Sequence, residues 1–256
     1  MKKNQIYYHR SHRKLTFFWK RFTVEFLLLV PPSCLFVFFL FPVLTYKATS
    51  FIIRFIPPEN AVSTLGITAK PFLFSEVYGP DLIGKYPSPL FSLFVFLAAI
   101  LIVFIVSKMK IPKPIAMWVY FICLVHLVSS LFFIFLPSRF PYNLQQFSEL
   151  FIKTEIIIWI FIPVVLGVSL LPLPSSIISK FIAVILALIY AIVFGLVRYV
   201  LFVYILLKFS YIFTAPLFFC FGPFIDFISI VGVYAFYLSL ISRKINQDLR
   251  IWSWSY

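Results

Sequence analysis

The chain has 256 residues, of which 62% are hydrophobic, and its mean hydropathy is +1.04. These values lie far outside those of soluble domains, so they exclude a water-soluble globular protein. The formal net charge of +14 is typical of nucleic-acid-binding proteins, but here the basic residues gather beside apolar runs, as they do at the flanks of membrane spans. We therefore predict an integral membrane protein in contact with lipids, without a nucleic-acid partner.

The first 22 residues form a basic segment that contains seven Lys and Arg side chains. Cytoplasmic flanks of membrane spans are rich in these residues, so the segment is expected in the cytoplasm, where it can also contact anionic headgroups. An arm that binds a partner protein is the alternative. The apolar run after this segment is longer than the core of a signal peptide, which predicts a retained anchor.

Six apolar runs reach the length of roughly 20 residues that a membrane-spanning helix needs. In chain order they are expected at residues 23–46, 89–106, 115–136, 154–171, 181–207 and 211–241. The predicted fold class is all-α: a polytopic helix bundle over residues 23–242 with both termini in the cytoplasm and a cytoplasmic tail at 243–256. Three prolines inside the first span predict that it is bent or interrupted.

The longest polar connection, residues 47–88, mixes prolines with charged residues. This composition predicts an ordered extracytoplasmic loop. Within it, residues 50–56 (SFIIRFI) are expected to form a short helix that lies in the interface.

The distribution of basic residues sets the predicted orientation. Of the 22 Lys and Arg residues, 14 fall on the side of the two termini and seven on the other side, with Arg198 inside a span. The pair Gly222–Pro223 interrupts the sixth region, so a re-entrant segment over residues 211–224 is the alternative to a continuous span.

Arg198 lies within the apolar sequence FGLVRYVLFVYILLKF, where a charge needs a carboxylate, carbonyl groups or a water-filled cavity. Asp226 follows the Gly222–Pro223 break, and Glu155 opens the fourth predicted span. We expect the three side chains to meet towards the outer leaflet. One interpretation is a site for an anionic headgroup, a peptide terminus or a lipid-linked substrate, and the other is an Arg198–Asp226 pair that fixes helix register.

His126 is a secondary candidate, because it lies near mid-membrane and one helical turn from Cys123. A metal site needs further ligands, and none is evident in the sequence, so neither a metal nor a cofactor is predicted. We expect His126 to hydrogen-bond within the bundle. Glu25, near the inner end of the first span, is expected to stay near the interface or to pair with the basic flank.

Residues 149–243 resemble the C-terminal half of the exosortase and archaeosortase family, membrane enzymes that process C-terminal sorting signals with a Cys, an Arg and a His or second Arg. The resemblance lies in the order of parts: a span that opens at the outer face, the exit and basic turn PVVLGVSLLPLPSSIISK, and a long helix containing GLVRYVLFVYIL. It implies that Arg198 corresponds to the first Arg of the family.

The sequence departs from this family at the other two positions. The family's nucleophilic Cys is replaced by KTEIII, with Thr154 near the equivalent place, and FGPFIDF replaces the last His or Arg. An unassisted threonine hydroxyl is a poor nucleophile. The resemblance therefore implies a catalytically degenerate relative that binds or guides a substrate without cleaving it.

Together these features predict a non-catalytic protein of a bacterial inner membrane. We expect a membrane-anchoring subunit or an accessory factor of a cell-envelope complex, with other membrane or envelope proteins as partners. The alternative is an enzyme for a lipid-linked or membrane-peptide substrate, with Arg198 as anion clamp and Glu155 or Asp226 as acid or base. A small transporter or channel is a weaker alternative, suggested by the interrupted sixth region.

Overall fold

The computed structural model describes residues 13–15, 18–55, 66–247 and 252–254, with side chains for 18–55 and 66–242. Seven α-helices occupy most of the described chain: α1 (Trp19–Arg54), α2 (Pro89–Lys108), α3 (Lys113–Phe135), α4 (Leu144–Leu170), α5 (Ile177–Lys208), α6 (Thr214–Phe221) and α7 (Pro223–Gln247). The short 3₁₀ turns η3 (Pro137–Arg139) and η4 (Tyr211–Phe213) precede α4 and α6. Within the described residues, six helical stretches are long and apolar enough to cross a membrane, with η4, α6 and α7 together forming the sixth. The predicted number of spans is confirmed by length and composition.

Polar residues fix where several helices begin. Asn143 caps α4 through a reciprocal pair of hydrogen bonds with Gln146, so two backbone donors that the first turn leaves free are satisfied. Ser88 and Ser176 accept hydrogen bonds from backbone N–H groups in the first turns of α2 and α5. The fourth helix therefore starts ten residues before the predicted start of its span.

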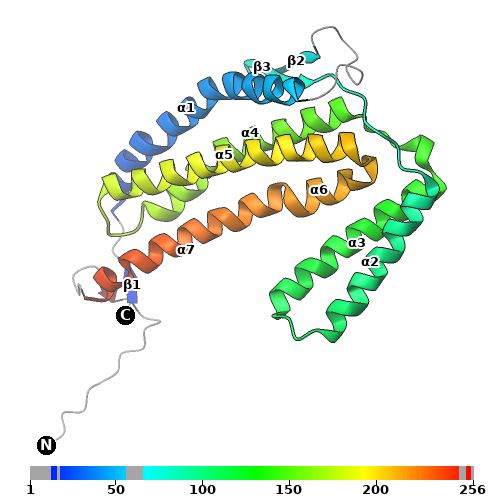
Figure 1. Cartoon of the computed structure of the whole chain (residues 1–256). Coiled ribbons are helices and arrows are strands. Elements are labelled where there is room, and N and C mark those ends of the chain that lie inside the picture. Colours follow the sequence, from blue (N-terminus) through cyan, green and yellow to red (C-terminus); the bar gives the residue numbers. More distant parts are fainter. Residues whose placement is uncertain (1–12, 16–17, 56–65, 248–251, 255–256) are drawn as a thin grey trace, which may run out of the picture.

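Helix α1 is continuous through all three of its prolines and curves without breaking (Figure 1). Of the two predicted alternatives, a bend or an interruption, the helix shows the bend. A separate short helix was predicted at residues 50–56. Residues 50–54 are helical but belong to the C-terminal end of α1, so the prediction of a separate helix is wrong there. With 36 residues and a rise of about 1.5 Å per residue, α1 is longer than the hydrocarbon core is thick.

The predicted all-α class is incomplete, because the structure also contains a β-hairpin in the predicted outer loop. Strands β2 (Ile67–Phe72) and β3 (Ser75–Pro80) pair antiparallel. The hairpin is bound to α1 by hydrogen bonds from the Thr49 hydroxyl to the Tyr78 carbonyl (3.0 Å) and from the Tyr78 N–H to the Thr45 hydroxyl (3.4 Å). Part of the predicted loop thus forms a hairpin that is held against the first helix.

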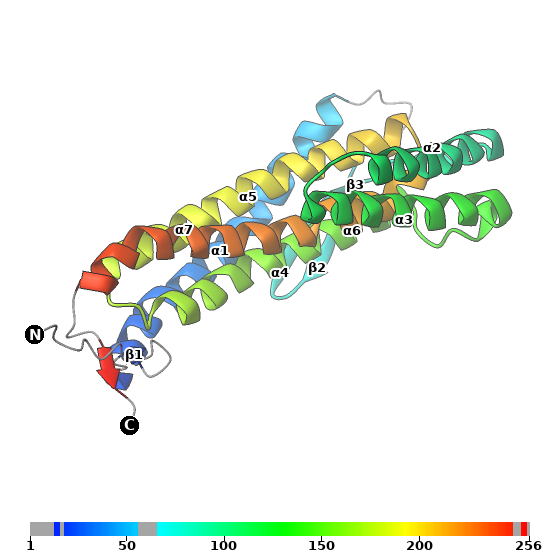
Figure 2. The same cartoon turned by 90° about the horizontal axis from the view of Figure 1, so that it is seen from below.

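The helices form a four-helix core and a projecting pair. Helices α4 and α5 pack against each other and against both α1 and α7. Helices α2 and α3 pair with each other and reach the core chiefly through contacts of α3 with η4 and α6. Figure 1 shows the α2–α3 pair diverging from α7, and in Figure 2 α3 lies over α6, with which it is in contact. Strands β1 (Arg13–Leu15) and β4 (Trp252–Trp254) pair beside the start of α1 and the end of α7, and we call this the terminal end of the bundle.

Helices α6 and α7 follow one another along a single direction in both views. The sixth membrane-length stretch is therefore interrupted, but the chain does not reverse direction within it, as a re-entrant segment over residues 211–224 would require. The interruption lies at Gly222, because Pro223 has no N–H group with which to continue the helical hydrogen-bond ladder. A Cβ atom on residue 222 would lie 2.4 Å from the Phe218 carbonyl oxygen, so this close approach of the backbone requires glycine.

Candidate functional site

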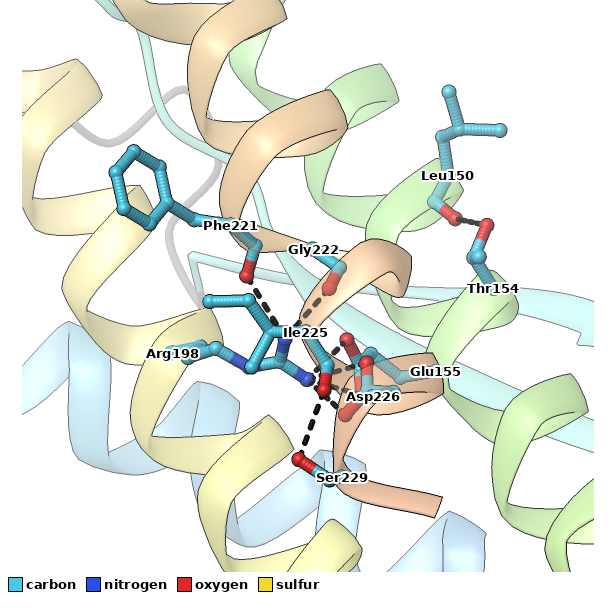
Figure 3. Close-up of polar contacts among 9 residues, drawn as sticks. All are labelled: Leu150, Thr154, Glu155, Arg198, Phe221, Gly222, Ile225, Asp226 and Ser229. Carbon is cyan, nitrogen blue, oxygen red and sulfur yellow. Dashed lines mark hydrogen bonds and ion pairs between the residues drawn. The ribbon is translucent and has the colours of Figure 1, made fainter. Parts of the chain in front are cut away.

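The structure brings Arg198, Glu155 and Asp226 together from α5, α4 and α7 (Figure 3). All three side chains are enclosed: the exposed fractions of the residues are 4%, 0% and 2%. Glu155 lies within α4, more than two turns from its start, because the helix begins at Leu144. The expectation that Glu155 opens the helix is therefore wrong, while the expected meeting of the three side chains is present.

One nitrogen of Arg198 faces both carboxylates. Its Nη2 lies 2.6 Å from both Oδ1 and Oδ2 of Asp226, and 3.0 and 3.2 Å from Oε1 and Oε2 of Glu155. The expected Arg198–Asp226 pair is in fact a three-residue cluster. Such charge-assisted contacts are the strong class of hydrogen bond, and they connect α4, α5 and α7.

The other terminal nitrogen of Arg198 binds the break between α6 and α7. Nη1 donates to the carbonyl oxygens of Phe221 and Gly222, both at 2.8 Å. These carbonyls are available because the helix is interrupted at this point. On another side of the guanidinium, the Phe194 ring lies with its centroid 5.0 Å from Cζ. The helix break and the arginine thus form one structural unit.

A glycine on α5 lets Glu155 approach this helix closely. A Cβ atom on Gly195 would lie 2.5 Å from Oε2 of Glu155 and 3.3 Å from Nε1 of Trp159. Gly195 is one turn before Arg198, so the carboxylate lies against the backbone of the helix that carries its cation. The Trp159 indole N–H and the Arg198 Nε–H are both buried and have no hydrogen-bond partner among the described residues.

Thr154, the candidate for the nucleophile position, does not join the cluster. Its hydroxyl donates to the Leu150 carbonyl oxygen of its own helix at 2.8 Å, and in Figure 3 it lies away from Arg198. Lys153, the residue before Thr154, pairs with Glu149 at 2.5 Å and lies over the Phe72 ring. Neither residue places a reactive group beside the guanidinium.

His126 also lies outside the cluster. Its ring packs edge-on against Phe213 with the centroids 5.7 Å apart, and its buried Nδ1 has no hydrogen-bond partner among the described residues. The expected hydrogen bond of His126 within the bundle is therefore not made by Nδ1. No group of three or more His, Cys, Asp or Glu residues in the described chain could hold a metal ion.

A second buried ion cluster, at the terminal end, was missed by sequence reasoning. Lys180 is fully buried; its Nζ lies 2.7 Å from Oε2 of Glu25 and 2.8 Å from the Leu171 carbonyl oxygen. Arg21 completes the cluster with a contact of 2.6 Å from Nε to Oε1 of Glu25. In the sequence, the signal for this cluster was Glu25, which lies four residues after Arg21 and directly before an apolar run. Its expected pairing with the basic flank is present, but Lys180 resembled an exposed turn residue.

Comparisons with known protein families, with curated proteins and with solved structures return no match. The function of the chain therefore has to be argued from its own geometry.

Proposed function

We propose that the chain is a non-catalytic, multi-pass membrane protein that serves as a membrane-anchoring subunit or accessory factor of a cell-envelope complex. We place it in a bacterial inner membrane, with the terminal end of the bundle in the cytoplasm and the β2–β3 hairpin outside. This orientation follows from the excess of Lys and Arg on the terminal side.

The observation that carries the proposal is the closure of the Arg198 cluster. A guanidinium has five N–H groups, and four of them, on Nη1 and Nη2, are directed at the chain's own carbonyls and carboxylates. An anionic substrate would have to displace these groups inside a buried site. The cluster is thus suited to hold helices together, and this argues against its use as an anion clamp.

The position of Thr154 supports the same proposal. A nucleophile needs a base within hydrogen-bond reach, but the Thr154 hydroxyl bonds to the carbonyl of Leu150 and is absent from the cluster contacts. If the chain is related to exosortases, we propose that it is a degenerate relative that binds or guides.

The projecting helix pair provides surface for membrane partners. Helix α2 buries only Ser92, Ala99 and Val106, at intervals of seven residues, which makes a narrow seam towards α3. Most of the remaining α2 side chains are apolar and exposed, although Phe91 and Val95 are partly buried against the core. Apolar surface of this extent is suited to lipid or to helices of a partner.

The test is extraction of the tagged chain from its native membrane in a mild detergent, followed by native sizing and mass spectrometry of the particle. We expect a particle larger than the chain alone, with another membrane or envelope protein at fixed stoichiometry. A lone chain that carries a bound peptide or lipid-linked molecule would contradict the proposal and favour an enzyme.

A variant pair sharpens this test. Thr154→Val removes the hydroxyl near the position of the family's nucleophile, and we expect the same yield, particle size and partner stoichiometry as for the natural chain. Ser107→Ala, which removes an exposed hydroxyl at the end of α2, is the matched control. Loss of a cellular function in Thr154→Val at unchanged complex yield would overturn the non-catalytic assignment.

A further inference from the structure

The charges of the Arg198 cluster do not balance. One guanidinium faces two carboxylates, and all three groups are almost completely buried. If every group were ionised, the cluster would carry one net negative charge inside the bundle. An uncompensated buried charge costs several kcal/mol, and proteins usually avoid it by changing a protonation state.

Among the described side chains, no other charged group of the surrounding helices supplies the missing positive charge. On α4, Lys153 is paired with Glu149, and on α1, Lys47 lies in a groove with Val197 and Leu201, on another face of α5. The remaining charged residues of α1 and α5 lie towards the helix ends: Lys20, Arg21, Glu25, Arg54, Lys180 and Lys208. Among the described side chains, α6 carries no charged residue and one buried thiol, Cys220, while Asp226 is the charged residue of α7.

The number of N–H donors in the cluster also falls short of the number of acceptor oxygens. Nη2 has two hydrogens but faces four carboxylate oxygens at 2.6 to 3.2 Å, and the hydrogens of Nη1 go to the two backbone carbonyls. The Trp159 N–H is near Glu155 and can serve one further oxygen. At least one carboxylate oxygen therefore lacks a donor among the described groups.

We propose that Glu155 and Asp226 together bind one proton in the folded protein. A proton on either carboxyl group supplies the missing donor and makes the cluster neutral, with one carboxylate left to pair with Arg198. Two carboxylates held this close cannot both ionise easily, so they titrate as a pair. Because Arg198 already occupies the space between them, a metal cation would have to lie beside the guanidinium and would be repelled by it.

Infrared spectroscopy of the purified protein in mild detergent tests this proposal directly. At neutral pH we expect a carboxylic acid C=O band that shifts in heavy water and is lost at high pH. In Glu155→Gln or Asp226→Asn the remaining carboxylate balances Arg198, so the band should vanish while the protein stays folded. Glu149→Gln, which alters a partly exposed ion pair, should leave the band in place.

Unfolding measurements give a second readout. Above about pH 4, where free carboxyl groups lose their protons, the folded state would hold one proton more than the unfolded state. The unfolding constant should therefore rise tenfold per pH unit until the folded protein loses this proton. In Glu155→Gln and in Asp226→Asn, this tenfold rise of the unfolding constant per pH unit should be absent.

Several outcomes would overturn the proposal. Folded natural protein without a carboxylic acid band is one, and a band that survives in both amide variants is another. If one amide variant fails to fold, the other decides. If both fail, the band of the natural chain and its loss with pH decide.

Discussion

At the scale of single residues, Arg198 contacts two buried carboxyl groups and holds two carbonyls at the helix break. We expect Arg198→Ala to destabilise the fold by about 3–5 kcal/mol, because it leaves Glu155 and Asp226 buried without their cation. The measurement is thermal unfolding in mild detergent, followed by size-exclusion chromatography of the folded fraction.

The rescue of this variant has to include both acids. Replacing Arg198 and Asp226 alone by apolar residues leaves Glu155 buried without a cation. The triple change Arg198→Met, Glu155→Leu and Asp226→Leu removes all the charges, and apolar replacement of a buried ionic cluster is often neutral. Recovery in the double variant but not in the triple would contradict the three-residue arrangement.

Gly195 provides a second prediction at this scale. Gly195→Ala places a Cβ atom 2.5 Å from Oε2 of Glu155, so we expect a loss of about 1–3 kcal/mol from overpacking. The matched control is Gly232→Ala, where nothing lies within 4 Å of the added atom. In a Glu155→Ala background the cost of Gly195→Ala should shrink, and a double-mutant cycle of thermal stabilities measures this coupling. Equal costs in both backgrounds would contradict the close contact.

At the scale of helices, the Glu25–Lys180 contact joins α1 to α5 at the terminal end. We expect Glu25→Leu to cost more stability than Lys180→Met. The first change leaves a fully buried ammonium with a single carbonyl, whereas the second leaves Glu25 paired with the half-exposed Arg21. Thermal unfolding of both variants checks the order.

The double variant and a control complete this experiment. Glu25→Leu with Lys180→Met removes both buried charges and should recover much of the lost stability. Glu149→Leu alters an ion pair that is about a quarter exposed, so its effect should stay within about 1 kcal/mol. A larger effect at Glu149 than at Glu25 would contradict the buried role of the terminal cluster.

The helices also show why sequence reasoning reached the cluster but not its geometry. A charge inside an apolar run must find a partner, and this argument identified Arg198, Glu155 and Asp226. Hydropathy marks only the apolar part of a helix, so it could not detect the polar first turns of α4 or the last turns of α1. Lys180 escaped because its burial depends on α1, a helix distant in sequence.

At the scale of the whole molecule, the pairing of β1 with β4 constrains the topology. Two paired strands must lie on the same side of a membrane, which requires an even number of crossings between them. The six membrane-length stretches satisfy this requirement. Since α2 alone separates the β2–β3 hairpin from the α2–α3 turn, those two sites must lie on opposite sides if α2 crosses the membrane.

Cysteine labelling tests this arrangement and its proposed orientation. In a chain with Cys34, Cys123 and Cys220 changed to Ala, we would introduce either Lys70→Cys in β2 or Lys110→Cys in the α2–α3 turn, both at exposed positions. A membrane-impermeant maleimide should label the first in intact cells and the second only after permeabilisation. The reverse pattern would contradict the proposed orientation, because it places the hairpin inside. Labelling of both in intact cells would contradict α2 as a span, because a single crossing must separate them.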